Sequence, residues 1–210
     1  MERPKTARRT FGPGRWREAG TPDLTPTLRG ALSAFREQGY HGTSVRDIAT
    51  RVGVTVPALY YHHGSKQGML VGLLDLAMDE LLLRLQFAIA EAGDSPVDRY
   101  RNIVQAIIFH VTYHQDLATL DDEIRSLEPE NRAHYSALRA QAERSLREAI
   151  EDGVRTGVFA TEHVADTARA ILGMVSSIRN WYTPDGPLTP PQIADRYANI
   201  ALDAVNASVD

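Results

Sequence analysis

Apolar residues recur along this chain at helical spacing, and no stretch of any length alternates with the period of a β-strand. The first apolar run covers residues 24–38 and ends at Gly39, a residue typical of helix C-termini. Its buried face is expected to contain Leu28, Ala31, Leu32 and Phe35, which lie at positions i, i+3, i+4 and i+7. The pattern therefore predicts an all-α chain.

The same periodicity predicts a series of longer helices after residue 65. They are expected over residues 66–92, from Pro96 through Val111, over residues 135–154, over residues 161–182 and from Thr189 onward. Residues 116–127 predict a shorter and irregular helix that ends near Pro129. The total is about nine helices, and we expect a boundary between two domains within the fourth one, near residue 70.

Residues 43–62 predict two short helices joined by a tight turn. Thr43 or Ser44 can cap the first helix, and Gly53 is placed where the chain must reverse. Pro57 lies close enough to the start of the second helix to be tolerated there. This arrangement is a helix-turn-helix. The outward positions of its second helix contain no acidic residue, so that helix can enter a DNA major groove.

Composition is that of a soluble globular protein, with 43% hydrophobic and 24% charged residues among 210. The absence of cysteine excludes disulfides and thiolate chemistry, and we expect a cytoplasmic protein with no signal peptide and no membrane span. The net charge of −4 is unevenly divided. Residues 1–68 carry 11 Lys and Arg against 5 Asp and Glu, a balance of +6, which leaves −10 for the remainder. Such asymmetry indicates a basic module for phosphates joined to an acidic module, although chance segregation of surface charge gives the same pattern.

Residues 1–22 form a basic, Gly- and Pro-containing segment that predicts a disordered N-terminal arm. It can track the phosphates or the minor groove of DNA, or it can be a solvated leader. Phe11 and Trp16 are unusual in a disordered segment and can dock elsewhere on the protein.

Several short motifs at fixed spacing resemble the DNA-binding domain of the TetR family of repressors. They are Gly39-Tyr40, Thr43-Ser44-Val45-Arg46-Asp47-Ile48-Ala49, Gly53-Val54, Leu59-Tyr60-Tyr61-His62, Ser65-Lys66 and Leu70, and His63 departs from the Phe usual in the family. The resemblance covers about residues 24–74. It implies a three-helix DNA-binding domain over residues 23–70, a ligand-binding and dimerisation domain over residues 71–210, and a homodimer formed by the last two helices.

The resemblance and the side-chain chemistry together predict which residues contact DNA. Phosphate contacts are expected from Thr43, Ser44, Tyr60, Tyr61, His62 and Lys66. Base or groove contacts are expected from Thr55, Val56, Pro57 and Ala58, and Arg46 is the main candidate for a bidentate contact with guanine. Alternatives are a phosphate contact or an ion pair for Arg46, and packing within the domain for Tyr60 and His62.

The C-terminal part offers candidates for a ligand site. His110 and His114 stand at i and i+4 with Tyr113 between them, a spacing that suits a metal, a cavity wall or a plain helix surface. No metal and no cofactor is expected. Residues proposed to line a ligand cavity are Phe109, His110, Tyr113, His114, Tyr135, Met174 and Trp181.

Residues 179–188, Arg-Asn-Trp-Tyr-Thr-Pro-Asp-Gly-Pro-Leu, are similar to a segment of TetR-like regulators of lipid, sterol and aromatic-acid degradation. The similarity implies an acyl-CoA thioester or another lipophilic acid as effector, although Trp181 and Tyr182 can instead anchor the dimer. Small residues on the last two helices, among them Gly173, Ser177 and Ala204, fit close helix contacts either between subunits or within one.

The sequence therefore predicts a homodimeric, ligand-responsive regulator of transcription, most simply a repressor that a small molecule releases from a palindromic operator on double-stranded DNA. A small-molecule binding protein with a non-functional helix-turn-helix is the alternative. Enzymatic activity is not expected, because the chain has no phosphate-binding glycine loop, no Gly-x-Ser-x-Gly motif and no His-Glu-x-x-His motif.

Overall fold

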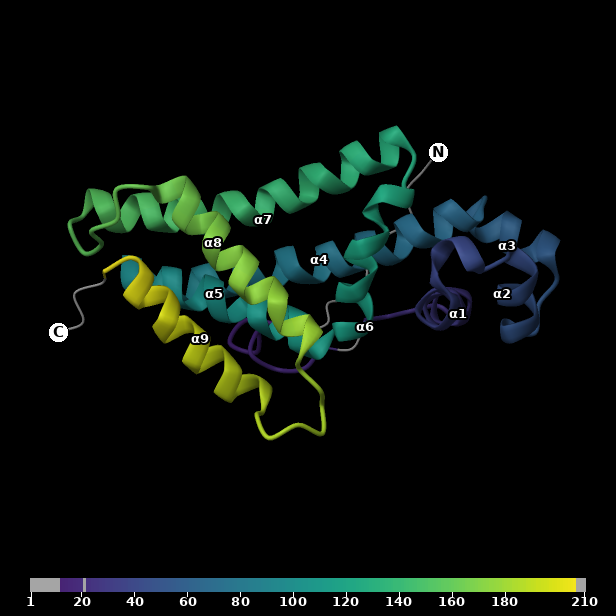
Figure 1. The fold of residues 1–210 in the computed structure, drawn as a ribbon, viewed down its shortest axis with the longest axis horizontal. Coiled ribbons are helices and arrows are strands. Elements are labelled where there is room, and N and C mark those ends of the chain that lie inside the picture. Colours follow the sequence, from purple (N-terminus) through teal and green to yellow (C-terminus); the bar gives the residue numbers. More distant parts are fainter. Residues whose placement is uncertain (1–11, 21, 207–210) are drawn as a thin grey trace. The chain divides into compact units, whose positions relative to one another are not determined.

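A computed structural model describes residues 12–20 and 22–206, apart from the side chain of His62. Its described residues form nine α-helices and two 3₁₀ helices, with no strand, so the all-α prediction is confirmed (Figure 1). The elements are α1 (Pro26–Gly42), α2 (Val45–Val52), α3 (Val56–His63), α4 (Lys66–Ala92), α5 (Pro96–Tyr113), α6 (Gln115–Ala118), η1 (Thr119–Ser126), α7 (Pro129–Arg155), α8 (Val164–Ser176), η2 (Ser177–Asn180) and α9 (Pro190–Ala204). Among the described helices, none is long and apolar enough to cross a membrane.

The described chain divides into two compact units. The first contains residues 22–79 and 116–138, and the second contains residues 12–20, 80–115 and 139–206. Helices α4 and α7 each continue from one unit into the other. The contacts within the chain place the division between the two units inside α4, between Asp79 and Glu80. The domain boundary predicted near residue 70 lies in the same helix and remains a prediction.

In the first unit, local signals in the sequence determine where α1, α2 and α3 begin and end. The Thr25 side chain caps α1, and the regular part of that helix ends at Gly39, whose φ is 71°. Ser44 and Asp47 form a reciprocal capping box at the start of α2, and Gly53 follows it in the left-handed conformation, with φ 74°. Thr55 caps α3. The expected helix-turn-helix is therefore present.

Close packing holds α2 against α1. A side chain at Gly30 of α1 would place its Cβ only 2.3 Å from Cγ2 of Val52, so glycine lets the two helices approach. The apolar side chains that close this small core are buried. They are Leu28, Ala31, Leu32, Phe35, Ile48, Ala49 and Leu59.

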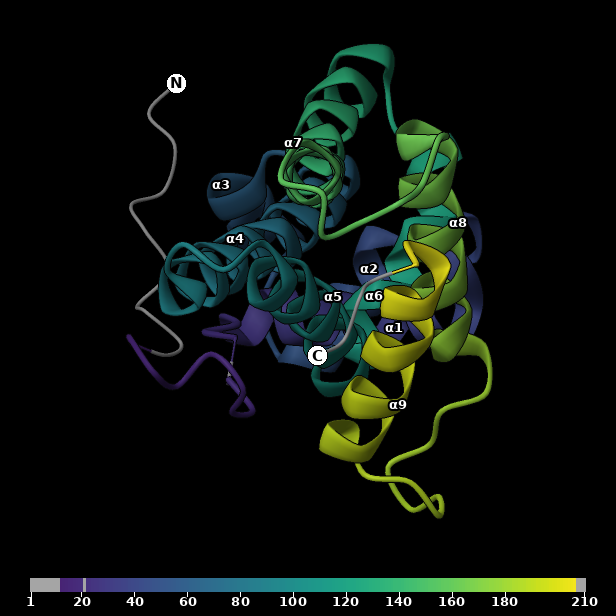
Figure 2. The same ribbon diagram turned by 90° about the vertical axis from the view of Figure 1, so that its left-hand side faces the viewer.

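The second unit is built around α5, which is buried at nearly every position from Tyr100 to Thr112. Helix α9, yellow in Figures 1 and 2, lies alongside α5, and α8 and η2 also pack on it. The hydroxyl of Tyr100 donates a hydrogen bond of 2.8 Å to the carbonyl of Ala201 on α9. Ile200 is an apolar residue of this helix, yet it is 50% exposed, because the side chains of Ile193, Ala198 and Ala201 are the ones that face the interior.

Residues 12–20 are packed against the second unit, and we call them the docked segment. Trp16 is completely buried, so the expectation of disorder for residues 1–22 is wrong for this part of the arm. The remaining arm residues 1–11, Phe11 included, and residue 21 lie outside the described part of the chain.

Candidate functional site

The helix-turn-helix presents a polar and aromatic surface. Tyr61 is 86% exposed and Tyr60 is 48% exposed, and both project from α3. Ser44, Thr55 and Pro57 are also exposed, whereas Val56 and Ala58 are partly buried. Exposed hydroxyl groups and methyl groups at the start of a helix are suited to a DNA groove, so these predicted positions stay candidates.

Arg46 and Arg51 lie on the same helix, α2, but in different surroundings. Arg51 donates two hydrogen bonds of 2.6 Å to the carboxylate of Glu37, which holds the pKa of Glu37 down to about 2. Arg46 is exposed and makes no ion pair with any side chain that the structure describes. Arg46 thus keeps its guanidinium available for a base or a phosphate, and an ion pair with Asp47 is not formed.

Two predicted phosphate contacts need correction. The side chain of Thr43 is buried, and its hydroxyl donates to the carbonyls of Ala34 and Gly39 at 3.0 and 2.8 Å. Thr43 therefore closes the end of α1 and cannot offer its hydroxyl to DNA without breaking these bonds.

Lys66 performs a similar structural task. Its ammonium donates to the carbonyls of Tyr40 and Thr43 at 2.8 Å each, and lies 4.3 Å from the centre of the Tyr40 ring. Two of its three N–H groups are occupied in this way, so Lys66 joins α4 to the end of α1. The predicted role of His62 concerns a side chain outside the described part.

In the second unit, a buried polar cluster lies between α4 and α5. It consists of Glu80, Arg84, His110 and His114, all of them buried. Arg84 Nε donates to Glu80 Oε1 at 2.8 Å, and His110 Nδ1 lies 2.5 Å from Glu80 Oε2. His114 Nε2 is 3.3 Å from Glu80 Oε1 but is not aligned for a hydrogen bond.

The electrostatics of the cluster favour an ionised carboxylate. Burial is the largest single influence and favours the neutral form of Glu80, but His110, His114 and the charge of Arg84 together outweigh it, so the pKa of Glu80 lies below its ordinary range. The buried charge of Arg84 is thereby balanced. The sequence signal for this pair is present, since Glu80 and Arg84 interrupt the apolar stripe of α4 at i and i+4, but periodicity alone does not predict their roles.

The structure brings four of the predicted ligand residues together at the end of one helix, and the others lie on different elements. Phe109, His110, Tyr113 and His114 all lie near the end of α5. The rings of Phe109 and Tyr113 are stacked, with centroids 5.5 Å apart. Tyr135 is buried in the first unit, where its hydroxyl donates to Asp121.

The two remaining predicted ligand residues lie on other elements of the second unit. Met174 is partly buried on α8, and Trp181 is 44% exposed and stacks on Tyr197 of α9. The exposure of Trp181 favours a contact surface over a cavity wall. Trp181 therefore fits the alternative that the sequence left open, an anchor of the dimer.

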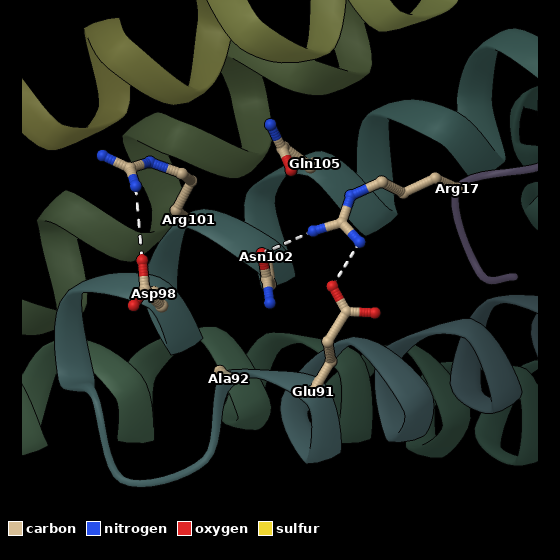
Figure 3. A pocket seen from close by; sticks show the side chains of 7 residues that line it. All are labelled: Arg17, Glu91, Ala92, Asp98, Arg101, Asn102 and Gln105. Atoms are coloured by element: carbon tan, nitrogen blue, oxygen red, sulfur yellow. Dashed lines mark hydrogen bonds and ion pairs between the residues drawn. The ribbon is translucent and has the colours of Figure 1, made fainter. Parts of the chain in front are cut away.

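A surface pocket of about 360 Å³ lies beside the docked segment in the second unit (Figure 3). Its lining is polar and consists of Arg17, Glu91, Ala92, Asp98, Arg101, Asn102 and Gln105. Each arginine has an acidic partner, Glu91 for Arg17 and Asp98 for Arg101. A pocket with balanced charges and little apolar surface is a poor match to a lipophilic effector.

Replacing Glu80 tests the buried cluster. Glu80→Gln keeps the shape but leaves Arg84 buried without a counter-charge, so we expect the free energy of unfolding to fall by about 3 kcal/mol in urea titrations at pH 7. Glu37→Gln, which disrupts the exposed pair with Arg51, is the matched control and should have a much smaller effect.

The acid side of the same titrations gives a second readout. A carboxylate whose folded pKa is lowered stabilises the fold above its unfolded pKa of about 4.3, and this contribution is lost as the pH falls toward the folded value. The loss of stability between about pH 5 and pH 3 should therefore be shallower in Glu80→Gln than in the unmodified protein. Equal stability of the two proteins at pH 7 would contradict the ion pair.

Comparison with known families agrees with the geometry of the first unit. Residues 28–73 match the family model for bacterial regulatory proteins of the tetR family, and residues 93–205 match the model for the tetracyclin repressor-like C-terminal domain. The two matches together cover most of the chain.

Individual relatives match this chain over most of their own length. The transcriptional repressor KstR2 of Mycobacterium tuberculosis is 28% identical over 179 residues, covering 83% of this chain and 88% of the repressor. The structure of the TetR-family regulator PfmR from Thermus thermophilus is 33% identical, covers 88% of this chain and 99% of its own, and has a TM-score of 0.75. AibR in complex with isovaleryl coenzyme A and operator DNA is 28% identical, covers 83% and 95%, and has a TM-score of 0.70.

These matches agree with the capped and exposed helix-turn-helix at the N-terminal side and with the helical second unit. The chain belongs to the TetR family of transcriptional regulators.

Proposed function

We propose that the protein is a homodimeric transcriptional repressor that binds a palindromic operator in the cytoplasm and is released by a small molecule. The observation that carries the DNA-binding part is the complete helix-turn-helix, in which Tyr60, Tyr61 and Arg46 are exposed. The family supports the same reading, because its matching relatives include the repressor KstR2.

Few side chains on this surface can distinguish bases. Arg46 can form a bidentate contact with guanine, while Val56 and Ala58 reach at most the methyl groups of thymine. Specificity then depends on two heads that read successive half-sites about 34–36 Å apart, and on the shape of the DNA between them. A dimer is therefore part of the proposal.

The dimer contact is proposed on α8 and α9. Outward positions on these helices, and on η2 and the residue after it, are apolar or small. They include Gly173, Ser177, Trp181 and Ile200, all exposed in the single chain. Exposed apolar side chains in one region mark a contact surface. Small residues beside them let helices of two subunits approach closely.

The effector is proposed to be an acyl-CoA thioester or another lipophilic acid. Two comparisons support this class. AibR binds isovaleryl coenzyme A in the complex named above, and the KstR2 structure, 27% identical with a TM-score of 0.78, is that of a ketosteroid regulator. The candidate residues Phe109, His110, Tyr113 and His114 supply aromatic surface and polar groups in the unit that matches the C-terminal domain model.

The operator can be selected from a random duplex library and used to test Arg46. Arg46→Ala should weaken binding to the selected duplex by about 5- to 100-fold, because a bidentate contact contributes about 1–3 kcal/mol. Arg51→Ala removes the same charge from the same helix but breaks a pair with Glu37, and should weaken binding less. No enrichment of any palindrome by the unmodified protein would refute specific DNA recognition and leave the binding-protein alternative.

Ile200→Asp tests the dimer surface. A carboxylate in an apolar contact between subunits remains without a partner, so sedimentation should show a monomer at concentrations where the unmodified protein is dimeric. Val154→Asp alters an exposed valine on α7 and is the control, which should stay dimeric. A dimeric Ile200→Asp variant would show that the subunits meet elsewhere.

Isovaleryl coenzyme A and longer acyl-CoA thioesters test the effector class, with free coenzyme A as control. A ligand that binds only the folded protein raises its melting temperature, by an amount that corresponds to about 2.7 kcal/mol at 100 times Kd. We expect a thioester to raise it and to weaken operator binding, by the same factor in both directions. No shift with any thioester at millimolar concentration would exclude this class.

A further inference from the structure

The docked segment is held mainly through its backbone. Arg84 donates to the carbonyls of Trp16 and Glu18, the latter at 3.2 Å, and the hydroxyl of Tyr113 donates to the carbonyl of Arg17 at 3.1 Å. Three consecutive carbonyls thus accept bonds from side chains of α4 and α5. These bonds fix which residues of the segment lie against α4 and α5.

Trp16 anchors the segment with its side chain. Its ring is fully buried and meets the ring of Phe109 edge to face, with centroids 6.1 Å apart. Its Nε1 donates to Glu91 Oε2 at 2.8 Å, so the one polar group of the indole is satisfied. The Arg17 guanidinium covers the outer face of the ring at 3.9 Å and pairs with Glu91.

The docked segment is joined to the DNA-binding helices by very little chain. It ends at Gly20, and Thr25 is already the cap of α1, so only residues 21–24 lie between them. Five peptide units span at most about 18 Å. While Trp16 stays bound, the docked segment is fixed on the second unit, so the start of α1 must remain within this distance of a fixed point.

We propose that the docked segment is a latch, a connection between the ligand unit and the start of α1 that is additional to the crossings of the chain in α4, in α7 and after Gln115. The inference rests on the proposed function as an operator-binding regulator. The latch restricts the positions that the helix-turn-helix explores, and this lowers the entropy that operator binding must remove. Release of Trp16 weakens operator binding.

The latch also has a direct relation to the ligand site. Phe109 and Tyr113, two of the candidate ligand residues, are the side chains that contact Trp16 and the Arg17 carbonyl. A ligand that moves either ring disrupts the contacts that hold the docked segment in place. The signal then reaches α1 through the docked segment as well as through α4.

Trp16→Ala in the full chain tests the latch, with Ala19→Ser as a neutral control at an exposed position of the same segment. Two quantities are measured, the rate of trypsin cleavage after Arg17 by mass spectrometry and the affinity for the selected operator duplex. We expect cleavage to be at least tenfold faster in Trp16→Ala, and operator affinity to be at least fivefold weaker, with affinity for random duplex unchanged. Ala19→Ser should match the unmodified protein in both.

Tyr113→Phe is a milder variant that removes only the bond to the Arg17 carbonyl. It should change both quantities in the same direction by a smaller factor, and it decides the outcome if Trp16→Ala loses its helical circular dichroism. Equal cleavage rates would show that the segment is not docked. Faster cleavage with unchanged operator affinity would show a docked segment that is not a latch. If the unmodified protein prefers no duplex, the proposed function fails, while the cleavage rates still report docking.

Discussion

The guanidinium of Arg84 has no exposure to solvent, and the interior of the second unit is arranged around this constraint. A charge removed from water needs a counter-charge and acceptors for its N–H groups, or it costs several kcal/mol. Glu80 supplies the counter-charge, and the carbonyls of Trp16 and Glu18 supply acceptors. Helix α4, helix α5 and the docked segment are thereby joined through one side chain, with His110 holding the carboxylate from the other side.

The DNA-binding helices follow a different principle. Their arrangement depends on local caps and on the glycines Gly30, Gly39 and Gly53, while α3 carries no acidic residue. Thr43 and Lys66 show that polar side chains near this surface are used within the fold. Both are predicted phosphate contacts, yet both are used to close the end of α1, so recognition of DNA is left to fewer side chains. On the proposed function, a surface with so few base-reading groups makes the pairing of two subunits more important for specificity.

The sequence is sufficient where the determining contacts are local. The bounds of α4, the caps Ser44 and Thr55, and the reversal at Gly53 all depend on residues within four positions of each other. The same periodicity predicts one helix over residues 161–182, but the structure has α8 followed by the 3₁₀ helix η2.

Prediction fails where a distant partner decides the outcome. Trp16 meets Glu91, 75 positions away, and no local pattern reports that contact. Thr43 is a nearer case, since its acceptors Ala34 and Gly39 lie nine and four positions away, but a capping pattern does not report that its hydroxyl is already used. Ile200 resembles a buried residue because the periodic pattern of α9 does not specify which neighbour covers each side.

Helix α4 has one more property that follows from its composition. Between Leu73 and Ala92 it contains neither glycine nor proline, and the division between the two units falls inside this stretch. This stretch contains none of the residues at which helices usually kink sharply, so we treat it as a rigid element about 30 Å long. A tilt of only about 5° at one end displaces the other end by about 2.5 Å, close to half of one helical turn. On the proposed function, a small tilt of this helix would therefore be large enough to misplace a side chain in the groove of DNA.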